Sequence, residues 1–342
     1  MYRICLFITL WLPLCVTAMP RGEARHLLAR TGFGPAQTEI EAMMKLDYAA
    51  GVTQLLSGAP AAAGTPPPDW VGDLPPARAE RRSLNEEEKK QQRKQARAWA
   101  LELKSWWYRE MISTPAPLTE RMTLFWHNHF TSSLRKVKWA PLLYRQNTLF
   151  RQHATGNFAA LLRAVSRDPA MLIYLDNARS KSGNPNENFA RELLELFTLG
   201  EGHYGEDDIK AAARAFTGWT LDPDHAGFRY AARWHDAREK TFLGWTGNWD
   251  GDDILDILLQ QPQLARHISR RMWREFVSPQ ADEKEITRIA AAFRNSGYEI
   301  KPLLRELLLS KAFRDPAGYG SLVKSPVELL VAIRNSVELS GT

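Results

Sequence analysis

The stretch NPNENFARELLELFTLG, residues 184–200, predicts a helix more clearly than any other part of the chain. Asn184 can cap its first turn, Pro185 suits that turn, and Glu187 can complete a capping box. Gly200 suits the C-terminal stop. At about 100° per residue, one arc of the helix is apolar. This arc contains Phe189, Ala190, Leu193, Leu194, Leu196 and Phe197. We therefore expect a helix with one buried face.

Helical patterns recur along most of the remaining sequence, so the predicted fold is mainly α, a multi-helix globular bundle. A long helix should begin near Asn85, with a charged, solvated first half and an inward stripe in its second half. The stripe contains Trp99, Leu103, Trp106, Trp107 and Met111. Further helices are expected at 117–130, 140–154, 157–176, 186–199, 206–217, 252–276, 282–295, 300–313 and 325–338. The aromatic, Gly-rich segment 228–249 has no helical period, and a small β-hairpin or irregular insertion fits it best.

The chain of 342 residues, 44% of them hydrophobic, can bury a large core. We expect a single helical domain over residues 19–342. Residues 57–84 are rich in Pro, Ala and Gly, and this composition predicts a flexible linker that packs only at Trp70.

The first eighteen residues have the layout of a cleavable signal peptide: Arg3, an apolar run from Ile4 to Val16, and small Ala18 before the cut. The run is shorter than the ~20 apolar residues of a membrane-spanning helix, so no transmembrane anchor is expected in the mature chain. Both cysteines lie in this segment, so the mature chain would hold no disulfide and no thiolate metal site. The chain should be exported, to the periplasm or beyond.

The net charge of +6 becomes +5 when Arg3 is removed with the signal, and this weakly favours anionic partners. Cations alternate with aromatic residues over 135–167, which is a pattern of nucleic-acid binding. Export and the helical spacing of the leucines there favour a solvated helix face instead, so no nucleic acid is expected.

The motif FWHNHF, residues 125–130, sets two histidines one residue apart. His129 falls on one helical face with Leu118, Met122 and Phe125 and should point inward. His127 lies about 200° away around a 3.6-residue helix, so the two rings cannot chelate one ion on a helix. The simpler reading is a core histidine near a helix C-terminus, where the dipole favours its charged form.

The polar arc of residues 187–198 has two readings. Glu187, Arg191 and Glu195 sit four apart and can form a surface ion ladder. Asn188, Glu192 and Glu195 share a stripe whose oxygens could bind a hard divalent ion. In ARWHDAREKTFLG, adjacent His235 and Asp236 precede Lys240, and these three residue types could serve as metal ligands, a proton-transfer group or an anion site.

Together FWHNHFTSS, NPNENFARELLELFTLGEGHY, AARAFTGWT, HDAREKTFLG and KSPVELLVAIR make the chain similar to the bacterial family called domain of unknown function 1800. The resemblance spans residues 25–334. It implies an exported, largely helical protein, often encoded beside a sulfatase-like partner, and it implies no catalytic residues. Family members usually continue past KSPVELL into a helical stretch with a Gly-Trp-Pro motif, so a C-terminally truncated chain is expected here.

Two functions follow from these motifs. In one, the histidines and acids converge on a pocket, with His129, Glu192 and Glu195 as ligands of a divalent metal for hydrolysis or transfer on an anionic or carbohydrate substrate. In the other, which we favour, the chain is a non-catalytic envelope factor whose polar motifs form buried hydrogen bonds and whose surface binds a partner protein. In either case FWHNHF should meet the helix of residues 187–198.

Overall fold

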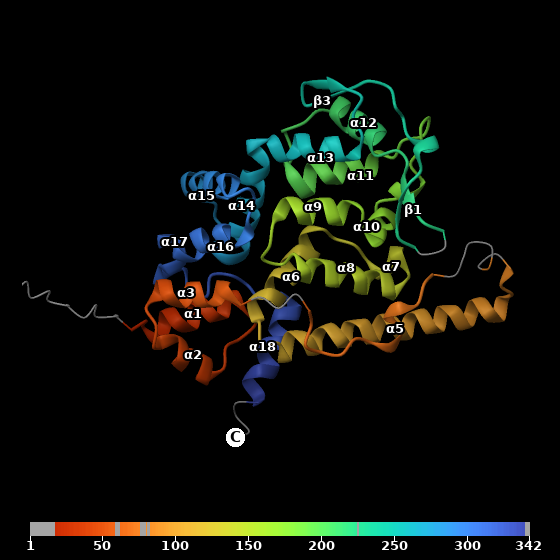
Figure 1. The fold of residues 1–342 in the computed structure, drawn as a ribbon. Coiled ribbons are helices and arrows are strands. Elements are labelled where there is room, and N and C mark those ends of the chain that lie inside the picture. Colours follow the sequence, from red (N-terminus) through yellow and green to blue (C-terminus); the bar gives the residue numbers. More distant parts are fainter. Residues whose placement is uncertain (1–17, 59–61, 76–79, 81–82, 224–225, 339–342) are drawn as a thin grey trace, which may run out of the picture.

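The structure is a computed structural model that describes residues 18–58, 62–75, 80, 83–223 and 226–338, with side chains up to residue 333. The predicted signal peptide, apart from Ala18, lies outside these residues. The fold is mainly helical, as predicted, and the described residues add two two-stranded antiparallel sheets (Figure 1).

Three short helices form the N-terminal corner of the molecule, next to the C-terminal helices (Figure 1). They are α1 (Arg21–Thr31), α2 (Gln37–Met44) and α3 (Tyr48–Ser57). The Tyr48 hydroxyl donates to the Leu308 carbonyl at 3.0 Å and so joins α3 to α16 (Ile300–Leu309). The chain therefore closes on itself, with residues 260 positions apart in contact.

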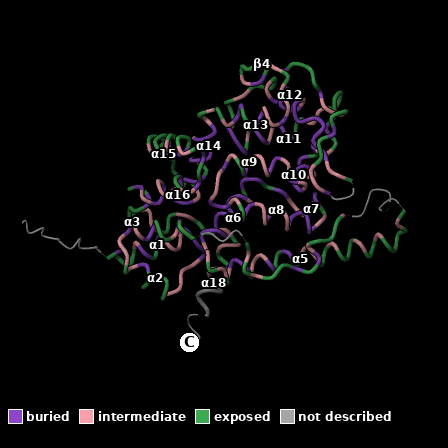
Figure 2. Tube along the Cα trace, in the orientation of Figure 1, coloured by how far each residue is buried: buried purple, intermediate pink, exposed green. Residues whose placement is uncertain are grey.

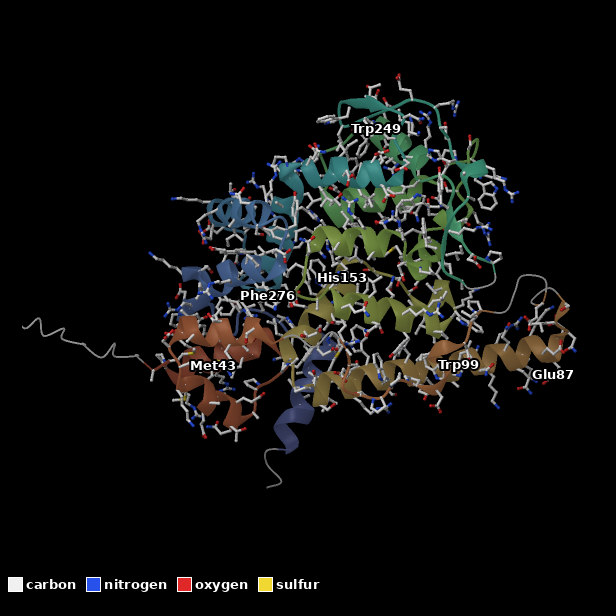
Figure 3. All side chains as sticks on the ribbon, in the orientation of Figure 1. Met43, Glu87, Trp99, His153, Trp249 and Phe276 are labelled. Carbon is white, nitrogen blue, oxygen red and sulfur yellow. The ribbon has the colours of Figure 1, made fainter. Side chains whose placement is uncertain are left out.

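The long helix predicted near residue 85 is α5 (Glu86–Ser113), capped by Asn85 in a capping box with Glu88. Its first half is largely exposed and extends beyond the body, whereas its second half packs (Figure 2). Figure 3 shows Glu87 at the far end of α5 and Trp99 closer to the body. The charged first half of this helix is thus exposed to solvent, and the second half, with its aromatic stripe, packs against the body.

The predicted flexible linker is more ordered than its composition indicates. Over residues 62–75 it lies against α5 and includes η1 (Asp69–Gly72). The backbone amides of Gly64 and Thr65 donate to the Glu110 carboxylate at 3.1 and 2.7 Å. Trp70 is buried and stacks on Trp99, with ring centroids 5.4 Å apart. A buried carboxylate that collects backbone amides fixes a segment that has no secondary structure of its own.

The centre of the molecule is a stack of helices above α5 (Figure 1). In chain order these are α6 (Pro117–His129), α7 (Leu134–Val137), α8 (Ala140–Gln152), α9 (Phe158–Ser166) and α10 (Pro169–Tyr174). The predicted single helix over 157–176 is wrong in one respect, because it breaks before Pro169. Proline has no amide hydrogen to continue the ladder, and Asp168 caps a new helix there.

A buried ion pair joins α6 to α8. The Arg151 guanidinium donates to the Glu120 carboxylate at 2.6 and 3.0 Å, and both side chains are almost fully buried. The Trp107 indole of α5 donates to the same carboxylate at 3.0 Å. Three helices therefore share one neutral polar core, which fixes where FWHNHF lies.

The upper part of the molecule contains the helix on which the sequence analysis centred (Figure 1). That helix consists of α11 (Glu187–Glu192) and a π-helix, η3 (Leu193–Thr198). The upper part also contains α12 (Glu206–Ala215) and α13 (Gly251–Gln260). The predicted insertion is a pair of hairpins that begins nine residues earlier than expected. Its strands are β1 (Trp219–Leu221), β2 (Phe228–Tyr230), β3 (Lys240–Phe242) and β4 (Trp245–Gly247).

The C-terminal helices cover the side of the stack next to α1 to α3 (Figure 1). They are α14 (Pro262–Phe276), α15 (Glu283–Asn295) and α17 (Lys311–Arg314), with α16 between α15 and α17. The last helix, α18 (Pro326–Glu338), packs instead against α5. The predicted helices 252–276 and 300–313 are each divided, before Pro262 and at Ser310, where a proline or a capping side chain starts a new helix. In the described part of the chain, none of the helices combines the length and the apolarity that a bilayer crossing requires.

Candidate functional site

The helix of residues 187–198 begins and ends differently from the prediction. Its N-cap is Asn186, not Asn184, and the Asn186 side chain accepts from the amide of Asn188 at 2.8 Å. Its last six residues, 193–198, form a π-helix. A π turn closes i→i+5 hydrogen bonds, so it rotates the following side chains relative to an α-helix. This explains why Leu196, predicted to be buried, is 50% exposed, while Thr198 is fully buried.

His129 points inward and FWHNHF meets this helix, as predicted. Its side chain is 3% exposed, and its Nε2 lies 3.2 Å from the carbonyl oxygen of Phe197. His267 of α14 lies beside it and makes the matching contact with the Leu196 carbonyl at 3.0 Å. A carbonyl oxygen only accepts, so both histidines carry their proton on Nε2. Two imidazoles therefore bind the carbonyls at the end of the π-helix.

The protonation state of His129 is the reverse of the prediction from the helix dipole. Burial lowers its pKa well below the ordinary value, and the charges of His267 and Arg271 lower it further. Burial alone also lowers the pKa of half-buried His127 to about 4. The His127 ring packs edge-on against Trp107, at 5.0 Å between centroids. Desolvation outweighs the dipole because the dipole stabilises a charge by at most ~2 kcal/mol, whereas taking a charged group out of water costs several kcal/mol.

Of the acids predicted to share a site with His129, Glu195 has another partner. Glu195 accepts from the Tyr204 hydroxyl at 3.1 Å, and burial together with Glu195 raises the pKa of Tyr204 to about 12. Burial, followed by the charge of Glu195, raises the pKa of Glu192. Across the described ranges, no group of three or more His, Cys, Asp or Glu side chains is placed to hold a metal ion. The set His129, Glu192 and Glu195 is thus not brought together; His129 meets a backbone carbonyl instead.

Arg191 forms only part of the expected ion ladder. It pairs with Glu206 through both terminal nitrogens at 2.8 and 3.0 Å and lies 3.8 Å from Glu187. These contacts tie α11 to the start of α12 at the surface. Exposed pairs of this kind contribute little stability.

A second polar cluster lies at the other end of the helix. Asn186 and Asn188 both donate from their side-chain amides to the Leu175 carbonyl, at 3.1 and 3.4 Å. The Asn186 amide donates to the Ser180 hydroxyl at 3.0 Å, and the Ser180 carbonyl accepts from Gly218. Gly218 has φ +86°, and an added Cβ would lie 2.9 Å from the Ala231 carbonyl. The glycine of AARAFTGWT is therefore required by the backbone at this crossing.

The HDAREK segment joins this second cluster. Asp236 is buried and accepts from Arg214 Nε at 2.9 Å and from Arg238 Nη2 at 2.6 Å. Its backbone amide donates to the Thr217 hydroxyl at 2.8 Å. The guanidinium groups of Arg238 and Arg214 hold the pKa of Asp236 well below its usual range. His235 Nδ1 lies 3.1 Å from the Thr217 carbonyl, so the neighbouring histidine also contacts backbone.

Lys240 is almost fully buried and donates to the Arg238 carbonyl at 2.9 Å. Burial lowers its pKa. The three residues His235, Asp236 and Lys240 thus share one loop, but each faces a different partner. Their joint role is to hold the chain between α12 and β3.

The three motifs do not converge on one pocket. The Asn186 cluster and the Asp236 cluster form one network, whereas His129 meets the opposite end of the helix. Eleven residues separate Asn186 from Phe197, which at a helical rise of about 1.5 Å per residue places the two ends roughly 15 Å apart.

The comparison with family models decides the family. The model described as "Protein of unknown function (DUF1800)" matches residues 26–340. The chain belongs to this family. Neither the curated proteins nor the solved structures gave a match.

In this family member, sequence reasoning missed two participants of the polar clusters. His267 lies in α14 without a motif of its own, and nothing in its sequence context points to Leu196. Arg214 lies in AARAFTGWT, three residues before Thr217, so the quoted motif contained the signal. One further contact explains KSPVELL: Glu328 accepts from the Ser325 amide at 2.8 Å and pairs with Arg121 of α6. This motif fixes the start of α18 to the body.

Proposed function

We propose that this chain is an exported, non-catalytic factor of the bacterial cell envelope that acts by binding a partner protein. The observation that carries the proposal is how the polar side chains of the motifs are used. Asp236 accepts from two guanidinium groups, Asn186 and Asn188 hold the Leu175 carbonyl, and His129 holds the Phe197 carbonyl. Such bonds connect buried groups that would otherwise be costly, and they position loops and helix ends.

Export is supported by the contacts of Met19. Met19, the residue after the proposed cleavage site, is 2% exposed, and its amide donates to the Leu46 carbonyl at 2.9 Å. In a mature chain that begins at Met19, the buried side chain is kept, and the N-terminal amino group can still donate to the Leu46 carbonyl. Mass spectrometry of protein from the envelope fraction should give Met19 as the N-terminal residue. Protein that retains Met1 and remains in the cytoplasm would refute export.

The surface proposed for the partner is the outer face of α18. Val331 is fully buried and packs with Phe33, Met111 and Leu124, so α18 is fixed to the body on one side. On the other side Leu329, Leu330 and Ile333 are 48, 57 and 51% exposed. Contiguous exposed apolar residues are typical of protein interaction sites. A partner with a complementary apolar groove fits this face, and the sulfatase-like exported protein implied by the resemblance is the candidate.

The test is co-expression of the chain with the proposed partner, a sulfatase-like exported protein, followed by size-exclusion chromatography. We expect one complex of the two chains, which Leu330→Glu abolishes. The matched control is Leu101→Glu on α5, which places the same charge at a residue 66% exposed. Loss of the complex in both variants, or in neither, would count against the α18 face.

A second measurement separates this proposal from a metal-dependent hydrolase. Elemental analysis of the purified protein and melting scans with and without chelator are compared. A metal that binds only the native state stabilises it by mass action. We expect no stoichiometric metal and the same midpoint in both scans. A stoichiometric metal with a chelator-sensitive midpoint would support the enzyme and oppose the non-catalytic factor.

A further inference from the structure

Six cations gather where α1, α6, α14 and the segment before α18 meet. Arg121 lies at the centre, with a side chain only 7% exposed. After burial, the charge of Arg121 lowers the pKa of Arg30 and of Lys324. The charge of Arg25 also lowers the pKa of Lys324. On α14, burial and then the charge of Arg274, one turn further on, lower the pKa of Arg271. We name this set the basic cluster: Arg25, Arg30, Arg121, Arg271, Arg274 and Lys324.

Two carboxylates balance the basic cluster incompletely. Glu275 pairs with Arg121 Nη2 at 2.8 Å, and Glu328 pairs with Arg121 Nη1. The other five cations form no ion pair with any residue in the described ranges. Six positively charged side chains on four neighbouring segments produce a positive potential that attracts anions.

The interior of the cluster also contains hydrogen-bond donors without acceptors. Arg121 Nε and Arg30 Nη2 are buried, and neither has a partner within the described part of the chain. Buried donors in proteins are paired in the great majority of cases, so each such group requires an explanation. Burial, followed by the charge of Arg121, lowers the pKa of Arg30 to about 10. The site thus holds positive charge that is poorly hydrated and incompletely compensated.

We propose that the basic cluster binds a phosphate or sulfate group. Guanidinium groups present N–H donors in a planar fork that matches the oxygens of such anions. A dianion would supply the charge that Glu275 and Glu328 leave uncompensated, and its oxygens would accept from Arg121 Nε and Arg30 Nη2. The group can be a free anion or an ester on a larger molecule, since both offer the same oxygens.

The test uses the purified exported protein with inorganic phosphate and inorganic sulfate as probes. Calorimetric titration is combined with melting scans in chloride at equal ionic strength, so that general salt effects cancel. Arg121 is left intact because its removal would strand two carboxylates. The variant is Arg30→Gln, which removes one of the two proposed donors. The control is Arg97→Gln on the exposed part of α5, which removes the same charge at an exposed residue.

We expect phosphate or sulfate to raise the melting midpoint above that in chloride. Arg30→Gln should weaken binding about tenfold, the scale of one charge-assisted hydrogen bond, and Arg97→Gln should leave it unchanged. Titration with phenyl phosphate and phenyl sulfate then identifies the source, because tighter binding of an ester indicates an esterified ligand and tighter binding of the inorganic ion indicates a free one. Absence of binding by all four probes, or equal losses in both variants, would overturn the proposal.

Discussion

The replacement Asp236→Asn tests whether the HDAREK motif serves the fold. The Asp236 side chain is 2% exposed and accepts from Arg214, which is 26% exposed, and from Arg238, which is 74% exposed. The Arg238 pair should contribute little to stability, because Arg238 is exposed and water and salt screen the pair. Breaking a fully buried pair costs ~3–5 kcal/mol, and partial exposure of Arg214 reduces this cost. We expect a total loss of about 2–3 kcal/mol from the free energy of unfolding.

The assay is thermal unfolding followed by circular dichroism at neutral pH. For a chain of this size a loss of 1 kcal/mol lowers the midpoint by about 2 °C, so Asp236→Asn should melt roughly 4–6 °C below the wild type. The control Arg238→Gln should melt close to the wild type, because its exposed pair contributes little. Asp236→Asn and Arg214→Gln should also be non-additive, because they remove one interaction.

The same variant has a defined pH dependence. Arg238 and Arg214 depress the pKa of Asp236 in the fold, whereas in the unfolded chain it titrates at about 3.9. The stabilisation by the carboxylate is therefore complete above that pH and is lost as the pH falls below it. The difference between the wild type and Asp236→Asn should shrink in acid. Equal midpoints at neutral pH, or strict additivity with Arg214→Gln, would refute the account.

Two further predictions concern the histidines and α18. Burial lowers the pKa of His127 and of His267 to about 4, so both rings stay neutral in the fold while the unfolded chain binds protons below about pH 6.5. The free energy of unfolding from urea titrations should fall as the pH is lowered from about 6.5 to 4. This fall should be shallower in His127→Phe. An unchanged slope in that variant would show that His127 is not held neutral in the fold. Glu328→Gln removes the ion pair with Arg121 and should speed limited proteolysis near the start of α18 severalfold. The control Glu306→Gln, which removes a half-exposed ion pair with Arg288, should not. Equal rates in both variants would show that the Glu328 pair does not hold α18.

The helical architecture could be predicted because most of its determinants are local. The spacing of apolar residues located α5, α6 and α12, and the predicted start near Asn85 lies one residue before the first residue of α5. Errors arose where proline or a capping residue divides a continuous apolar period, as at Pro169 and Pro262. Apolar periodicity survives such a break, since both halves bury the same face, so the period alone does not reveal it.

Residues 62–75 of the predicted linker show a different limit of sequence-based prediction. Composition describes what a segment can do alone, and residues 62–75 have little tendency to fold alone. Their structure comes from outside, from the Glu110 carboxylate and from the Trp70 contact with Trp99. A carboxylate 45 residues away along the chain is invisible to any local rule.

The sequence predicted which side chain of the candidate site points into the core, but not its hydrogen-bond partner. Helical spacing placed His129 inside and brought FWHNHF to the helix of residues 187–198, because a face buried on one helix must meet a neighbour. The choice of Glu192 and Glu195 as partners assumed that polar side chains pair with each other. In folded proteins most side-chain hydrogen bonds go to backbone or water, and here Phe197 and Leu175 supply carbonyls.

The π-helix accounts for why histidine occupies this position. An i→i+5 turn ends with carbonyls that no later amide of the helix satisfies, and those of Leu196 and Phe197 face His267 and His129. The donor has to reach a buried carbonyl without bringing a charge into the core, and a neutral imidazole with its proton on Nε2 does so. A lysine would carry a charge there, and a phenylalanine would leave the carbonyl unpaired. The depressed pKa of His129 is thus a condition of its structural role, since the neutral ring is the form that the core accepts.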